Sequence, residues 1–387
     1  MGVWLFVVAI LGVVMVHESG HFLVAKAFGF QATKFFVGFG PTLWSFHKGE
    51  TEYGIKALPL GGFVKITGMN PYEEVPEEDR ARSYPNKPRW QRALVLVAGS
   101  ATHWILVFVV LVPTLMFIGL PSNEGSNQLY AVQGSSPASE AGLEPGDRIV
   151  GVGGRTTESW AEIRGYIRTH GGDEVTFTVA RAGEAREVTT ELWWALYNAR
   201  GRPIDFAPTR AELPEAKPGR STVGFLGVSP EQAYETESFL GAIGGAGGIT
   251  GRLTQGAVKS IGALFTQIFD GSLVEAITDE GQRAPDEGAV GLVGAGRVAG
   301  ATVAAGDYLN FILLLSGLTI GIGILNLLPL PPLDGGHLAV VAYEAVTKRT
   351  VDLRKLIPIA AAVISFFVLL FLAVLYLDLA RPIEIPF

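Results

Sequence analysis

The sequence predicts a polytopic α-helical membrane protein with four transmembrane helices, a β-hairpin element and an inserted α+β domain. The first observation is composition: 48% of the 387 residues are hydrophobic and only 17% are charged, against about 25% charged in a typical soluble domain. The second is that the apolar residues gather in four long runs with few charges. The third is the chain between these runs, where short strand-like segments alternate with glycine-containing turns.

Each apolar run is long enough to cross a membrane, which takes roughly 20 residues. The runs cover residues 3–27, 93–120, 308–330 and 356–377. A signal peptide is the alternative for the first run, but this run lacks a basic leading segment and a small-residue cleavage site. We therefore expect four spans.

The basic residues predict the orientation of the spans, because short loops rich in Lys and Arg stay in the cytoplasm. Residues 26–92 hold 10 basic and 7 acidic residues, whereas residues 121–305 hold 15 basic and 23 acidic residues. The loop between the last two spans carries Lys348, Arg349, Arg354 and Lys355. This distribution places both termini and the long loop outside, and the two basic loops inside.

The chain has no cysteine, which excludes disulfides, Cys-ligated zinc, iron–sulfur clusters and thiol catalysis. Any metal must therefore be bound by the six His residues or by Asp and Glu. The net charge of −7 argues against a nucleic-acid partner, because such proteins usually present a basic face.

The strongest local signal is the sequence His17-Glu18-Ser19-Gly20-His21 within the first apolar run. Two His residues four positions apart lie on one face of a helix and can bind one zinc ion together. Glu18 can then act as general base toward a water molecule whose pKa the metal lowers to about 7. Ionisable side chains cost free energy inside a transmembrane helix, so their presence there indicates a functional site. A polar helix-packing cluster is the alternative.

A catalytic zinc usually takes three protein ligands and leaves one position open. Asp334 is the candidate for the third ligand, because it follows three closely spaced prolines at the end of the third span. These prolines end the helix, and unwound backbone at membrane depth survives only inside protein or beside a cavity. A solvated Asp at an ordinary helix exit is the alternative, and the residues alone leave both open.

Two short strands are expected at 42–57, about a turn at Lys48 and Gly49. An exposed strand edge in this loop could hold an extended substrate by β-addition. A self-contained hairpin that covers the active site is the alternative.

Residues 129–192 have the elements of a PDZ-like domain: a short helix after Ser135, a strand at 148–152, a helix at 160–167 and a hairpin about Gly183. Such domains bind extended peptides, and a steric plug that excludes uncut substrates is the alternative. Residues 193–229 are interpreted as a linker, and residues 239–269 as an amphipathic gate on the membrane surface. The predicted domains are 1–120 (two spans and the hairpin), 121–192 (PDZ-like), 193–305 (linker and gate) and 306–387 (two spans).

The motif HESGH, the later NLLPLPPLDGGH and the PDZ-like insert together resemble the site-2 protease family, in particular its RseP-like bacterial branch. These proteins are intramembrane zinc metalloproteases with a membrane-associated β element. The resemblance implies Zn²⁺ as cofactor, with His17, His21 and Asp334 as ligands and Glu18 as catalytic base. It also implies that Asn326, Pro329 and Pro331 bind substrate, and that the protein lies in a bacterial inner membrane. With the N-terminus outside, His17 lies about 21 Å along the first span from Val3, which places the active site toward the cytoplasm.

One position departs from the family pattern. Family members commonly have Gly-Pro-x-x-Asn early in the second span, whereas this chain has Gly99-Ser-Ala-Thr-His103. His103 is grouped here with the substrate-binding residues, as a polar group that contacts substrate or orients a ligand. A hydrogen bond between helices and direct ligation of zinc, which would close the open position, are the alternatives.

The resemblance implies a zinc metalloendopeptidase that cuts in or near the transmembrane segment of single-span regulatory proteins, within membrane lipid. The expected substrates are similar to anti-sigma factors and are first shortened outside by a site-1 protease; remnant signal peptides are a second class. The alternative function is a catalytically silent or gated scaffold that acts through the PDZ-like domain, supported only by His103. A metal-ion transporter would need ligands along a path, and the sequence offers one cluster.

Overall fold

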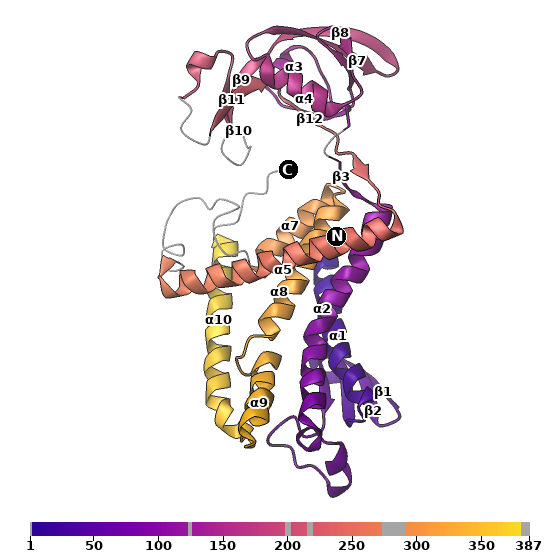
Figure 1. Ribbon diagram of the computed structural model, residues 1–387, viewed down its shortest axis with the longest axis vertical. Helices are drawn as coiled ribbons and strands as arrows, with labels where there is room; N and C mark the ends of the chain where they lie inside the picture. The colour runs from indigo at the N-terminus through magenta and orange to yellow at the C-terminus, as the bar shows by residue number, and fades with distance from the viewer. Residues whose placement is uncertain (1, 123–125, 198–202, 215–219, 273–290, 381–387) are drawn as a thin grey trace. The chain divides into compact units, whose positions relative to one another are not determined.

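The computed structural model describes residues 2–122, 126–197, 203–214, 220–272 and 291–380. The chain folds as two compact units (Figure 1). The first unit combines residues 1–115 with residues 238–387, and the second contains residues 116–237. The second unit is therefore an insertion in the chain of the first.

Four long apolar helices of the first unit correspond to the four predicted spans. Each is long and apolar enough to cross a membrane, and a helix satisfies its backbone hydrogen bonds without water, as lipid requires. They are α1 (Gly2–Ala27), α2 (Arg89–Phe117), α8 (Tyr308–Asn326) and α10 (Ile357–Ala380), the last preceded by the 3₁₀ turn η4 (Leu353–Leu356).

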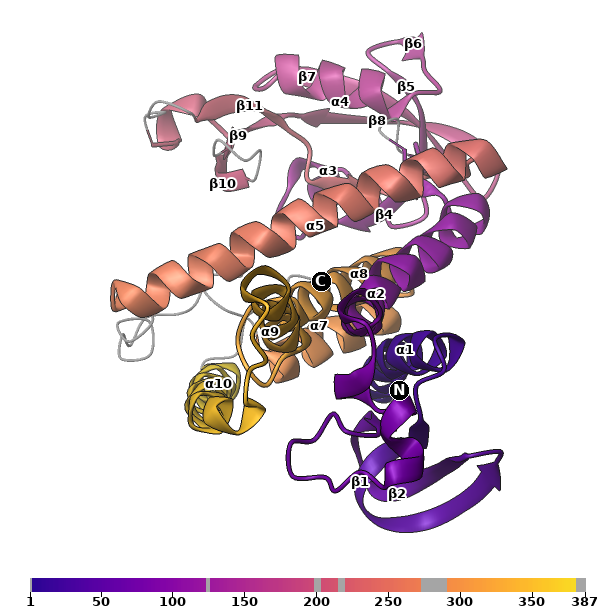
Figure 2. The same ribbon diagram turned by 60° about the horizontal axis from the view of Figure 1, so that its bottom comes forward.

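Three further helices pack among the spans: α5 (Phe239–Phe269), α7 (Leu292–Ala304) and α9 (Asp334–Thr347). Helix α5 crosses α2 and α8 (Figure 2), and the indole Nε1 of Trp104 donates to Thr254 Oγ1 over 3.1 Å. Helix α7 packs on α1 and α8. The α10 carboxylate of Asp378 accepts from the first backbone N–H groups of α7, which joins these two helices.

The loop after α1 forms a hairpin of two long strands, β1 (Ala32–Lys48) and β2 (Thr51–Ile66), followed by the turns η1 (Glu77–Arg82) and η2 (Tyr84–Asn86). The two short strands expected at 42–57 are therefore only its distal part. The strands are longer because residues 34–37 pair on one side with 52–55 and on the other with 62–65. Residues 62–66 consequently form an outer edge, with no further strand paired to them in the described chain.

Glu50 anchors the tip of this hairpin to the rest of the unit. Its carboxylate accepts from Lys26 Nζ (2.6 Å) and from both terminal nitrogens of Arg82 (2.6 and 2.8 Å). The hydrogen bonds from Arg82, with a smaller contribution from Lys26, hold the pKa of Glu50 at about 2, against its usual 4.5. The hairpin is thereby tied to the end of α1 and to η1.

The Glu50 network makes the hairpin sensitive to acid. Because the folded-state pKa lies below the unfolded-state pKa, the network stabilises the hairpin above about pH 4.5. This contribution is lost as the pH falls toward 2, and for partly exposed ion pairs we expect it to be about 1 kcal/mol.

Limited proteolysis should show increasing cleavage of the wild-type hairpin as the pH is lowered from 7 to 3. Glu50→Gln should be cleaved faster at pH 7 and respond less to acid; an unchanged acid response would contradict this account.

The second unit is an α+β domain. Its core contains Leu129, Ile149, Ile163, Phe177 and Leu226. Its helices are α3 (Pro137–Glu140), α4 (Trp160–Thr169) and the 3₁₀ turn η3 (Arg210–Glu212). Its strands are β3 (Leu120–Pro121), β4 (Leu129–Val132), β5 (Arg148–Val152), β6 (Arg155–Thr156), β7 (Glu174–Arg181), β8 (Glu184–Glu191), β9 (Trp193–Tyr197), β10 (Pro203–Ala207), β11 (Ser221–Phe225), β12 (Val228–Pro230) and β13 (Tyr234–Glu235). A four-stranded sheet has the order β6-β5-β7-β8, and a three-stranded sheet has the order β10-β9-β11. Strand β4 pairs with β12, and β3 pairs with β13.

The interpretation of residues 193–229 as a linker is wrong. Strands β9, β10 and β11 form a sheet in this stretch, and Leu226 is buried in the core of the domain. Apolar side chains at Leu196 and Ala207 bury a second small cluster, which a solvated linker would not supply. The predicted fold class is confirmed as a polytopic helical membrane protein with a β-hairpin element and an inserted α+β domain.

Candidate metal centre

Three potential metal ligands from two helices converge in the first unit. His17 and His21 lie one turn apart on α1, and Asp334 is the first residue of α9. The Nε2 atoms of the two imidazoles are 3.1 Å apart, and each is 3.2 Å from Asp334 Oδ2. Among the described residues, these three form the only group of at least three His, Cys, Asp or Glu side chains whose ligand atoms lie close enough together to share a metal ion.

The hydrogen bonds around this triangle leave lone pairs directed at its centre. His21 Nδ1 lies 2.8 Å from the carbonyl oxygen of Val95, and because a carbonyl can only accept, the neutral ring carries its proton on Nδ1. Nε2 of His21 is then unprotonated. Asp334 Oδ2 is buried and has no hydrogen-bond partner among the described residues. A metal cation between the three atoms would satisfy these lone pairs.

The donor set fits zinc. Imidazole nitrogen and carboxylate oxygen are common zinc ligands, and tetrahedral ligation at about 2.0–2.1 Å places donor atoms about 3.3–3.4 Å apart, close to the observed 3.1–3.2 Å. Three protein ligands leave one position for water or substrate, as in catalytic zinc sites.

The segment between α8 and α9 presents Asp334 to the two imidazoles. Helix α8 ends at Asn326, and the proline-containing backbone turns back against the start of α9. A Cβ on Gly335 would lie 2.2 Å from two carbonyl oxygens of this segment, and one on Gly336 would lie 2.5 Å from the Pro331 nitrogen. The Asp-Gly-Gly sequence is therefore needed for the close backbone approach that brings Asp334 to the site.

Helix α2 lies directly behind the two His residues. A Cβ on Gly20 would be 2.5 Å from the Ala98 carbonyl oxygen, and a Cβ on Gly99 would be 2.2 Å from His21 Nε2. Small residues thus allow α1 and α2 to approach closely. The roles of Gly99 and of the Val95 carbonyl were not predicted from the sequence. A small residue inside a span was the available signal for Gly99. A backbone carbonyl leaves no signal in the sequence.

Glu18 contacts the outer edge of the hairpin. Its Oε2 accepts a hydrogen bond from the backbone N–H of Val64 over 3.0 Å. Val64 belongs to the edge segment 62–66, and the neighbouring Gly62 lies so close to α1 that a Cβ there would be 2.4 Å from Met15 Sδ. The carboxylate next to the first imidazole therefore lies beside an unpaired strand edge.

Comparison with known proteins identifies the family. Residues 5–372 match peptidase family M50. This chain belongs to family M50. It is 33% identical to zinc metalloprotease Rip1 of Mycobacterium tuberculosis, over 99% of this chain and 98% of that protein. It is 30% identical to metalloprotease MmpA of Caulobacter vibrioides, over 89% of this chain and 86% of that protein.

Among solved structures, the chain is similar to the PDZ domain of an SdrC-like protein from Listeria monocytogenes. The identity is 23% and the TM-score 0.18, over 21% of this chain and 83% of that domain.

Membership of family M50, the site-2 proteases, confirms the resemblance drawn from the sequence. The protein is a zinc metalloprotease and a multi-pass inner-membrane protein. The scaffold alternative rested on His103, and this residue does not join the group of three ligand atoms.

The remaining site residues predicted for the M50 protease lie as follows. Asn326 is half-buried at the end of α8, and Pro329 and Pro331 lie in the segment before Asp334; their substrate-binding role stays a prediction. His103 is buried on α2 behind His17, with Nε2 3.0 Å from Nδ1 of that ring. Its direct contact is with the candidate ligand His17, and its contact with substrate stays a prediction.

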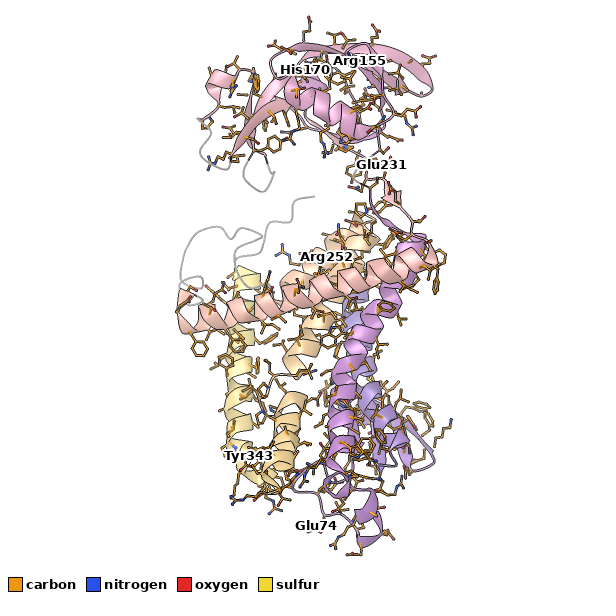
Figure 3. The ribbon with its side chains drawn as sticks, in the orientation of Figure 1. Glu74, Arg155, His170, Glu231, Arg252 and Tyr343 are labelled. Atoms are coloured by element: carbon orange, nitrogen blue, oxygen red, sulfur yellow. The ribbon has the colours of Figure 1, made fainter. Side chains whose placement is uncertain are left out.

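The other three His residues lie outside the ligand cluster. His47 pairs with Glu52 in the hairpin, and His337 lies in the first turn of α9. His170 belongs to the inserted domain (Figure 3). Its ring stacks on that of Tyr166, with 3.8 Å between the ring centroids.

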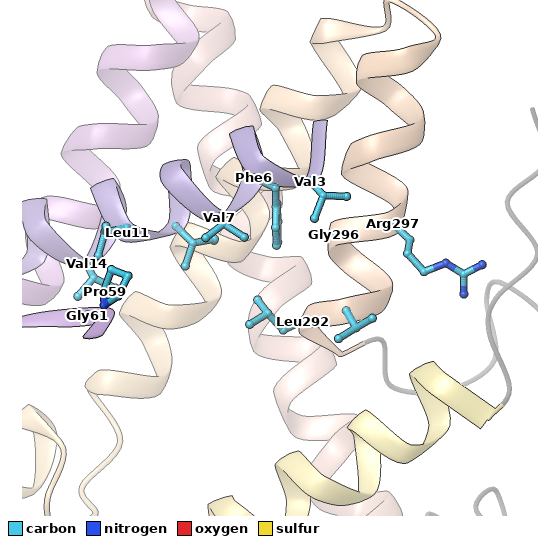
Figure 4. A pocket seen from close by; sticks show the side chains of 12 residues that line it. Val3, Phe6, Val7, Leu11, Val14, Pro59, Gly61, Leu292, Gly296 and Arg297 are labelled. Atoms are coloured by element: carbon cyan, nitrogen blue, oxygen red, sulfur yellow. The ribbon is translucent and has the colours of Figure 1, made fainter. Parts of the chain in front are cut away.

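An apolar groove of the M50 protease runs along α1 and ends at the hairpin edge. It has a volume of about 380 Å³ and lies between α1, α7 and β2 (Figure 4). Its lining extends from Val3 to Val14 of α1, one turn before His17, and includes Gly61 beside the edge segment 62–66. The groove thus connects the apolar flank of α1 to the strand that contacts Glu18.

Proposed function

We propose that His17, His21 and Asp334 hold the catalytic zinc and that Glu18 is the general base in hydrolysis of a peptide bond. The observation that carries this proposal is the convergence of three ligand atoms within 3.2 Å, beside a carboxylate on the same helix. Bound zinc supplies Lewis-acid polarisation of the scissile carbonyl and lowers the pKa of a water molecule.

Glu18 takes the proton from the attacking water and later donates it to the leaving amine. The Val64 N–H holds its carboxylate at the hairpin edge, so that the base lies where an extended peptide would run. Asn326, Pro329 and Pro331 align the substrate backbone from the side of Asp334.

A substrate helix must unfold before its peptide bond can reach the metal. We propose that residues 62–66 hold the unfolded segment as an added β-strand. The outer edge of β2 and its contact with Glu18 support this role over a hairpin that only covers the site. The apolar groove along α1 suits the transmembrane part of the same substrate.

The proposed substrates are single-span regulatory membrane proteins similar to anti-sigma factors, already cut outside by a site-1 protease; remnant signal peptides are a second class. The lipid-facing apolar helices and the groove along α1 support a membrane-embedded substrate. The inserted domain has a groove of about 330 Å³ between α4 and residues 224–230, lined by Trp160, Arg164 and Arg168. This groove supports capture of a peptide end in addition to exclusion of uncut substrates.

We propose that both termini and the inserted domain lie outside, and that the metal site lies toward the cytoplasm. The excess of basic residues in the two short loops supports this orientation. His17 lies about 21 Å along α1 from Val3, past the middle of a membrane about 30 Å thick.

Glu18→Gln should lower the rate of cleavage of a model transmembrane substrate at least about 100-fold, because it removes the general base. Zinc content should stay at the wild-type value, since no ligand changes. The measurement is cleavage by the purified, zinc-loaded protein in detergent, together with metal analysis.

Glu74→Gln is the matched control, because Glu74 is exposed in the loop before η1 (Figure 3). The Glu74→Gln protein should cleave the substrate at the wild-type rate. Wild-type cleavage by Glu18→Gln would overturn the proposed mechanism.

A further inference from the structure

His103 lies against the back of a proposed zinc ligand. It is on α2, its relative exposure is 1%, and its Nε2 is 3.0 Å from Nδ1 of His17. The opposite nitrogen of His17, Nε2, is the atom that faces His21 and Asp334. His103 is therefore on the far side of the His17 ring from the metal position.

The hydrogen bond between the two rings can have only one direction when His17 binds a metal. A neutral imidazole has one N–H and one lone pair, and a metal at Nε2 needs the lone pair there. The proton of His17 must then be on Nδ1, and His103 Nε2 must accept it. The reverse direction would put a proton on the metal-binding nitrogen of His17.

We propose that His103 is a positioning residue that accepts the Nδ1–H of His17 and so fixes the zinc-binding tautomer and orientation of that ring. This inference rests on the proposed ligand set. His21 has the equivalent support from the Val95 carbonyl, so each imidazole ligand has an acceptor on α2. Such outer partners of metal-bound His residues orient the ring and raise its basicity.

The packing around His103 keeps its ring in place. Gly323 of α8 lies so close that a Cβ on it would be 3.0 Å from His103 Cβ. The His103 and His17 rings are 5.1 Å apart between centroids and tilted by 45°, so they meet through their nitrogens and do not stack. Helices α1, α2 and α8 therefore meet at this hydrogen bond.

The test compares His103→Leu, which removes the acceptor, with His103→Gln, whose amide oxygen can accept near the position of Nε2. Zinc affinity of the purified full-length protein is measured by competition with a chelator, and the visible spectrum is recorded after loading with Co²⁺. We expect His103→Leu to bind zinc about 10- to 100-fold more weakly and to change the Co²⁺ spectrum. His103→Gln should restore affinity to within about threefold of wild type.

Unchanged zinc affinity in His103→Leu would overturn the proposal, and so would equal losses in the Leu and Gln variants, because packing alone would then explain the residue. Circular dichroism and thermal unfolding of both variants establish that they are folded. His17→Ala separates this proposal from the ligand assignment: if His17→Ala binds zinc as tightly as wild type, the proposed ligand set fails, whatever the His103 variants do.

Discussion

Gly99→Ala is expected to abolish zinc binding and peptide cleavage, although it adds a single methyl group. The new Cβ would lie 2.2 Å from Nε2 and 2.4 Å from Cε1 of His21, far inside van der Waals contact. The His21 ring cannot rotate away without losing both its bond to the Val95 carbonyl and its place beside Asp334. The helices cannot separate easily, because Gly20 of α1 packs directly on the Ala98 carbonyl.

The zinc affinity of Gly99→Ala should fall by more than the 10- to 100-fold typical of changes to outer partners, because a proposed ligand itself is displaced. Overpacking should also cost about 1–3 kcal/mol of folding free energy. Metal analysis, cleavage of a transmembrane substrate and thermal unfolding measure the three effects. The clash displaces His21, on which both zinc binding and cleavage depend. We therefore expect the two activities to be lost together.

Gly12→Ala is the matched control on α1, because a Cβ on Gly12 meets nothing within 4 Å. Alanine favours a helix over glycine by up to about 1 kcal/mol, so this variant should keep full zinc content and cleavage. A Gly99→Ala protein with wild-type zinc content would mean that α1 and α2 can move apart around His21.

The parts of this protein that were predicted correctly depend on local pattern. An apolar run of about 20 residues defines a span by itself, and the spacing of His17 and His21 places both on one face of a helix. Asp334 is different, because it joins the two imidazoles only through the packing of α9. The sequence around Asp334 is equally compatible with a metal ligand and with a solvated side chain. Only the resemblance to the site-2 proteases favoured the metal ligand.

Long-range strand pairing accounts for the errors. Residues 34–37 have partners in two separate parts of β2, so the hairpin is longer than its turn signal indicated. Strand β9 pairs with β10 and with the more distant β11, and these short strands do not stand out in a stretch rich in Pro, Arg and Glu. Backbone groups such as the Val64 N–H and the Val95 carbonyl carry no residue-type signal at all.

Arg92→Met should destabilise the protein by about 3–5 kcal/mol, because it leaves a buried carboxylate without its partner. Arg92 of α2 donates to Glu344 of α9 over 2.5 Å, and the two side chains are 10% and 7% exposed. Burial alone would raise the pKa of Glu344, but hydrogen bonds from the Val351 N–H and Arg92 outweigh it and lower the pKa. The pair therefore joins α2 to the helix that begins with Asp334.

The destabilisation of Arg92→Met should lie near the lower end of the range of about 3–5 kcal/mol, because the charge of Arg89 also acts on Glu344. Replacing both partners, as Arg92→Met with Glu344→Gln, should recover much of the stability, since the Gln amide oxygen can still accept from Val351. The midpoint of thermal unfolding in detergent and a titration with denaturing detergent measure these differences, and the double-mutant cycle isolates the pair.

Arg80→Met is the matched control, because Arg80 pairs with Glu77 in a bridge whose side chains are 60% and 83% exposed. Its loss should cost less than about 1 kcal/mol. The contrast follows from solvation. Water replaces Arg80 at the Glu77 carboxylate, whereas the buried Glu344 keeps, among the described residues, the Val351 N–H and the more distant charge of Arg89. Equal stability of the Arg92→Met and Arg80→Met proteins would mean that water reaches Glu344, and that packing alone holds α9 against α2.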